Sequence, residues 1–282
     1  MTMPRMTLKR FLVGTATAVA LALLPSLVQA VYVTPHAVFM THGARAGQVT
    51  VGNSGEAPEE VTVELRFGFP DTDSAGTPFI RFVEDPGPEF PSAVEWIRPY
   101  PRRLRLEPGE QQVVRLLATP PDDLPEGEYW TRMIVTGQGA SVPIETADTS
   151  VRAGVSLVMR IITAVTYRKG TVTTGITLRG LDAAVDGDSV AVWVNATREG
   201  NGAYLGTVNF ELVGSDGQHV TEWIIPIAVY YPMNRRFALP VESIPAGTYL
   251  LRLTIDSERP DLRPDDVLPA PAVSDSVEIV VP

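Results

Sequence analysis

The stretch Val61–Phe69, which reads VTVELRFGF, has the residue pattern that decides the fold class. Every odd-numbered position in it is apolar, and Thr62, Glu64 and Arg66 stand between the first four of them. Successive side chains of a β-strand point to opposite faces of the sheet, so this alternation predicts a strand with one buried face.

The same period of two recurs along the chain, and no segment sustains a helical period. Short strands at regular spacing, separated by turns such as Pro108-Gly109 and Asp216-Gly217, predict an all-β protein built from immunoglobulin-like β-sandwiches. The other strands expected from this pattern are Val31–Phe39, Gln48–Asn53, Gln111–Ala118, Tyr129–Thr136, Ser189–Thr197, Leu205–Val213, Trp223–Tyr230, Thr248–Asp256 and Ser276–Val281.

A weak internal repeat indicates two such sandwiches. LPEGEY, ending at Tyr129, and IPAGTY, ending at Tyr249, each place a tyrosine at the start of a late strand, just after a Pro/Gly corner. A tyrosine in this position is typical of immunoglobulin-like sandwiches. We expect one domain over residues 31–168 and a second over residues 169–282.

The longest strand expected is Gly154–Arg168, which reads GVSLVMRIITAVTYR. It has no proline and no internal glycine, and at roughly 3.3 Å per residue it greatly exceeds the usual strand of five or six residues. Apolar side chains occupy both of its faces. One face fits the domain's own core, which leaves the other face for a further contact.

The first thirty residues read as an export signal. Arg5, Lys9 and Arg10 precede an apolar run of fourteen residues, Phe11–Leu24, and VQA ending at Ala30 fits a cleavage site. A membrane anchor is the alternative, but the run is shorter than the about 18 residues that a spanning helix needs. We therefore expect cleavage after Ala30 and an exported protein without stable membrane insertion.

Charge and composition exclude several classes of partner and site. The formal charge is −10, and loss of three basic and no acidic residues with residues 1–30 would make it −13. This balance disfavours nucleic acids and anionic lipid surfaces, which attract clustered Lys and Arg. The chain has no cysteine, so disulfides, thiolate catalysis and cysteine-bound metals are excluded.

The sequence gives little support to an enzyme. The three histidines, His36, His42 and His219, lack metal-binding spacing, and nucleophile-elbow and phosphate-loop motifs are absent. Carboxylates gather in turns without matching a calcium loop. We expect no enzymatic activity, no metal and no cofactor. The carboxylate groups are Asp71 and Asp73; Asp182, Asp186 and Asp188; and Asp256, Glu258, Asp261, Asp265 and Asp266.

One run supports a named resemblance. PYPRRLRLEPGEQQVVRLL (Pro99–Leu117), followed by LPEGEYWTRMIV (Leu124–Val135), resembles the first domain of periplasmic pilus-assembly chaperones of the chaperone–usher pathway. The opening residues 31–53 also look like the first two strands of that family. The resemblance covers about residues 31–168, and the second domain matches by architecture alone.

The resemblance implies a chaperone that lends a strand to fimbrial subunits. In that family the last strand of the first domain completes the subunit's sheet, and alternate apolar side chains fill the subunit's groove. In this chain the corresponding strand is Gly154–Arg168. The donated side chains would be Val155, Leu157 and Met159, with Ile161 as a fourth candidate, whereas Val158 and Ile162 would face the chain's own core. An outer-membrane usher is a candidate second partner.

The chain departs from the family at the carboxylate anchor. The family holds the subunit's C-terminal carboxylate with an arginine and a lysine, and this chain has His36 and Ala164 there. Arg160, Arg168 and Lys169 are the neighbouring candidates to replace them. The alternative function is an exported structural or adhesion module of two β-sandwiches, in which the long strand is only a core element; a sugar-binding protein is a more remote alternative.

Overall fold

The computed structural model describes residues 31–139 and 158–282, and every regular element in them except one short helical turn is a β-strand. Strands β1 to β10 form two sheets that enclose one apolar core. The first sheet has the order β1 (Val31–Thr34), β3 (Ala46–Asn53), β8 (Gln111–Ala118), β6 (Ile97–Tyr100). The second has the order β2 (Ala37–Thr41), β10 (Val158–Lys169), β9 (Gly127–Gly139), β4 (Glu59–Thr72), β5 (Pro78–Val83), and β7 (Arg103–Leu106) also pairs with β4.

Strands β11 to β17 form a second sandwich with its own core. One sheet has the order β11 (Thr174–Asp186), β12 (Ser189–Gly200), β15 (Met233–Pro240). The other has the order β14 (His219–Val229), β13 (Tyr204–Gly214), β16 (Gly247–Asp256), β17 (Val273–Val281). The helical turn η1 (Pro264–Asp266) lies between β16 and β17. The predicted all-β fold of two immunoglobulin-like sandwiches is confirmed.

The two tyrosines of the sequence repeat have equivalent roles. The Tyr129 hydroxyl donates to the carbonyl of Pro125 at 3.0 Å, and the Tyr249 hydroxyl donates to the carbonyl of Pro245 at 2.8 Å. Each bond fixes the corner that precedes a late strand of its sandwich. The repeat therefore reflects the same corner built twice.

The predicted first strand, Val31–Phe39, is two strands. β1 pairs with β3 in the first sheet, and β2 pairs with β10 in the second. Pro35 lies between them, and proline has no N–H with which to continue a ladder. The chain therefore crosses from one sheet to the other at this point.

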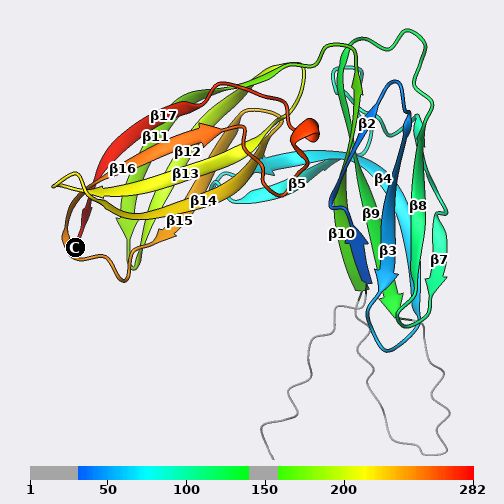
Figure 1. The fold of residues 1–282 in the computed structure, drawn as a ribbon, viewed down its shortest axis with the longest axis horizontal. Coiled ribbons are helices and arrows are strands. Elements are labelled where there is room, and N and C mark those ends of the chain that lie inside the picture. Colours follow the sequence, from blue (N-terminus) through cyan, green and yellow to red (C-terminus); the bar gives the residue numbers. More distant parts are fainter. Residues whose placement is uncertain (1–30, 140–157) are drawn as a thin grey trace, which may run out of the picture.

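The two sandwiches share a set of contacts. The long hairpin of β4 and β5 reaches from the first sandwich toward the second (Figure 1), where the Arg236 N–H donates to the Gly76 carbonyl at 2.9 Å. An apolar cluster joins Phe67, Phe69 and Trp130 of the first sandwich to Ala203, Leu205 and Tyr230 of the second. No helix in the described ranges has the length and apolar character needed to cross a membrane.

Candidate partner-binding strand

Strand β10 has an open edge along half of its length. It pairs with β9 from Val158 to Lys169, but with β2 only from Ala164 to Arg168. Within the described part of the chain, nothing pairs with the β2 side of residues 158–163. A row of unpaired backbone groups of this kind is a template for another strand.

The direction of the open backbone groups follows from one hydrogen bond. The Ala164 N–H donates to the His36 carbonyl at 3.2 Å, so it points toward the β2 side. Backbone groups alternate in direction along a strand, and the register with β9 is continuous. The N–H and C=O groups of Val158, Arg160 and Ile162 therefore point out of the open edge, and those of the odd-numbered residues bond to β9.

The side chains of β10 also alternate, but opposite to our expectation. Val165 and Tyr167 are buried in the core of the first sandwich, and Met159 and Ile161 pack partly against it. Val158 and Ile162 were expected in that core, and this was wrong: they are 52 % and 38 % exposed on the outer face.

Parity explains the reversal. Since β10 has no bulge, the inward direction of Val165 and Tyr167 carries through to Met159 and Ile161. Val155 and Leu157, the other two predicted donor residues, lie outside the described residues. Whether any of the four contacts a partner stays a prediction.

Two of the four anchor candidates are committed to internal bonds. The Arg168 Nε donates to Glu128 Oε2 at 2.8 Å, and the Arg168 guanidinium also lies 4.9 Å from the Phe39 ring centre. The Lys169 ammonium donates to the Leu124 carbonyl. His36 and Arg160 are exposed and lie at the open edge. These two remain available to an incoming anion.

Arg132 is a further cation, beside Ala164, that sequence reasoning missed. It lies on β9 directly opposite Ala164, so both side chains are on the outer face. Arg132 is only 5 % exposed, its Nε donates to the Gly68 carbonyl at 2.9 Å, and its Nη2 is buried without a hydrogen-bond partner. Only the register of β9 against β10 brings it beside Ala164, and no sequence motif shows that register.

A polar contact fixes the other end of β10. Arg45 Nη2 lies 3.1 Å from His42 Nε2, and His42 Nδ1 lies 2.7 Å from the Tyr167 hydroxyl. Because arginine can only donate, Nε2 of a neutral His42 accepts, and Nδ1–H donates to Tyr167. Desolvation, followed by the charges of Arg45 and Lys169, lowers the pKa of His42.

The described residues contain no group of three or more His, Asp or Glu side chains arranged to hold a metal ion. His36 and His42 flank β2, and His219 begins β14 in the other sandwich. Glu128, the most buried carboxylate of those discussed, is saturated by donors from Trp130, Arg168 and Ala203.

Comparisons with known proteins were made by sequence and by structure. No family model and no curated protein matches the chain. The fold is similar to the CsuC–CsuE chaperone–tip adhesion subunit complex of Acinetobacter baumannii, with 15 % identity, 74 % of this chain and 90 % of that chain covered, and a TM-score of 0.39.

Two further solved structures give overlaps of the same size. The YadV chaperone has 14 % identity over 89 % of this chain and 100 % of that chain, with a TM-score of 0.40. The SafA pilin in complex with the SafB chaperone, from Salmonella enterica, has 15 % identity over 88 % and 96 %, with a TM-score of 0.39. Overlaps this small leave the function to be argued from the chain's own geometry.

Proposed function

We propose that the chain is a periplasmic chaperone that stabilises exported pilus or fimbrial subunits by pairing β10 with an incomplete sheet of the subunit. The observation that carries this proposal is the open edge of β10 over residues 158–163. A partner strand there would bond to the outward N–H and C=O groups of Val158, Arg160 and Ile162. The run Pro99–Leu117 and the predicted export signal over residues 1–30 add support.

Apolar side chains beside this edge supply further affinity. Val158 and Ile162 stand exposed on the outer face, and Met159 and Ile161 lie half-buried on the inner face. Burial of each exposed Val or Ile side chain is worth roughly 1.5–3 kcal/mol before the costs of ordering the partner. The partner so described is an extended apolar strand with its own unpaired backbone.

An exposed cation at the edge provides a place for a carboxylate. Arg160 lies between Val158 and Ile162 and has no charged partner within the described residues, and His36 is also exposed beside Ala164. We propose that Arg160 takes the anchor role. An outer-membrane usher stays a prediction from the resemblance.

A side-chain substitution tests the proposal. We expect the double variant Val158→Asp/Ile162→Asp, co-expressed with an exported subunit from the same cell, to lose most of the soluble subunit recovered by the wild type. The matched control is Ile224→Asp/Val280→Asp, which alters two residues that are 58 % and 61 % exposed on the second sandwich. If both double variants recover the subunit as the wild type does, the structural or adhesion module becomes the better account.

A further inference from the structure

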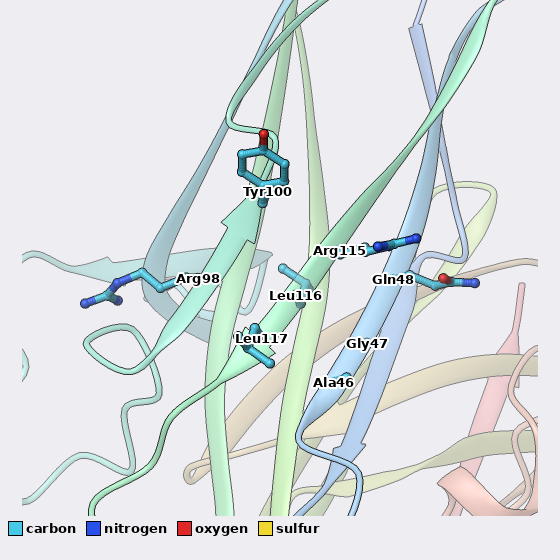
Figure 2. A pocket seen from close by; sticks show the side chains of 8 residues that line it. All are labelled: Ala46, Gly47, Gln48, Arg98, Tyr100, Arg115, Leu116 and Leu117. Carbon is cyan, nitrogen blue, oxygen red and sulfur yellow. The ribbon is translucent and has the colours of Figure 1, made fainter.

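A second apolar surface lies on the opposite sheet of the first sandwich. The outer faces of β3, β8 and β6 carry a shallow groove of about 550 Å³ (Figure 2). Leu117 is 60 % exposed on its floor, and Tyr100 is 77 % exposed at one end. Its lining residues are Ala46, Gly47, Gln48, Arg98, Tyr100, Arg115, Leu116 and Leu117.

Strand register builds this groove. Leu117 lies between Ala46 on β3 and Arg98 on β6, and the next outward row places Arg115 beside Tyr100. The methyl group of Ala46 is too short to cover Leu117, so the centre of the sheet stays bare. The groove therefore has an apolar floor because the small residue Ala46 lies beside the large residue Leu117.

Two guanidinium groups border the apolar floor. Arg98 donates Nη1 to the carbonyls of Val94 and Ile97, both at 3.0 Å, and Arg115 is exposed in the row beside it. Within the described residues neither forms an ion pair with a carboxylate. The chain as a whole carries a formal charge of −10, so this is a local positive site on an acidic protein.

We infer that this groove binds an extended segment of a second partner protein, in which an aromatic or leucine side chain is flanked by carboxylates. The bare Leu117 and Tyr100 fit the apolar side chain, and each arginine can bind a carboxylate through two parallel N–H bonds. An anionic membrane is disfavoured because the rest of the acidic chain would be repelled from it.

This surface is independent of the strand that we propose for subunits. β10 belongs to the second sheet, and the groove lies on the outward face of the first sheet, with the core between them. Both surfaces can therefore be occupied at once. A segment of a partner protein could then bind the loaded protein without competing for β10.

The test uses a labelled synthetic peptide with a central phenylalanine and leucine flanked by aspartates, titrated into the full mature protein and followed by fluorescence anisotropy. We expect the peptide affinity to fall about tenfold in Leu117→Asp, which removes the apolar floor of the groove. We expect a similar fall in Arg115→Glu, which loses a bidentate arginine–carboxylate pair. The matched control Ile224→Asp, at a residue 58 % exposed, should bind as the wild type does. The variant Val158→Asp/Ile162→Asp should also bind normally, which separates this site from the β10 edge.

Three results would overturn the inference. They are the absence of peptide binding at millimolar concentration, equal binding of a peptide with asparagines in place of the aspartates, and unchanged affinity in both groove variants. A separate experiment measures the binding of the protein to vesicles that contain phosphatidylglycerol. Retention on them that is lost in Arg115→Glu, without peptide binding, would mean that the groove is a membrane-docking site instead.

Discussion

Glu128 connects three parts of the molecule through one carboxylate. Its Oε1 accepts from Trp130 Nε1 at 2.7 Å and from the Ala203 N–H of the second sandwich at 3.0 Å. Its Oε2 accepts from Arg168 Nε at 2.8 Å. The side chains of Glu128 and Arg168 are 1 % and 13 % exposed, so water has little access to this ion pair.

Glu128→Ala is therefore expected to be strongly destabilising. Removal of one partner leaves the Arg168 charge buried and unpaired, which costs about 3–5 kcal/mol. Urea unfolding followed by tryptophan fluorescence would measure the loss. The control is Glu107→Ala, which breaks the Arg105–Glu107 pair, whose side chains are both 56 % exposed; it should cost at most about 1 kcal/mol. Equal losses in the two variants would refute the role of Glu128.

The lowered pKa of His42 predicts that the stability of the folded protein depends on pH. Its pKa is lowered in the folded protein from its ordinary value of 6.5, chiefly by desolvation and then by Arg45 and Lys169. As the pH falls, His42 is protonated in the unfolded chain before it is protonated in the folded protein. The stability that neutral His42 contributes to the folded state is therefore complete above pH 6.5 and is lost below it. Between pH 7.5 and 5.5, the urea midpoint of the wild type should fall more than that of His42→Gln. Equal falls would show that His42 does not titrate in this way.

The strands themselves could be predicted where one face is buried. Gln111–Ala118 matches β8, and the expected strands at Leu205–Val213 and Thr248–Asp256 lie within β13 and β16. β11 and β15 were missed because neither alternates cleanly. β11 contains two glycines and a register shift between Leu178 and Gly180, and β15 begins with three polar residues after Met233.

The face of β10 could not be predicted, for a physical reason. Thr163, Val165 and Tyr167 are buried by the sandwich's own core, but Thr166 on the opposite face is also buried, at 3 % exposure. Apolar or small residues on both faces carry no signal about which one is inward. The open edge was equally hidden, because it depends on β2 ending its pairing at Ala164.

The two sandwiches meet at the apolar cluster that contains Phe69 and Tyr230. Phe69 is 5 % exposed, and its ring centre lies 4.4 Å from that of Tyr231 in the second sandwich. We propose residues 31–168 and 169–282 as two domains that this cluster couples. Apolar contacts between two domains can make both cores unfold in one cooperative transition. Loss of those contacts lets each core unfold separately.

Phe69→Ala should uncouple the two domains. The lost contacts are worth about 3–5 kcal/mol, typical of Phe→Ala in a packed site. Scanning calorimetry should show one transition for the wild type and two for this variant. Phe237→Ala, which removes a ring from the second core alone, should lower the transition temperature without the same separation. A wild type that already unfolds in two steps would contradict the coupling.

The most direct test of strand addition is a proline at position 160. The Arg160 N–H points out of the open edge, so Arg160→Pro removes a bond that the isolated protein does not make, and proline is tolerated at such an edge. Arg160→Ala also loses the arginine side chain but keeps the N–H, so the two variants differ in the backbone donor. We expect both variants to unfold near the wild-type urea midpoint, and Arg160→Pro to recover far less co-expressed subunit than Arg160→Ala. Equal recovery by the two variants would contradict binding through this edge.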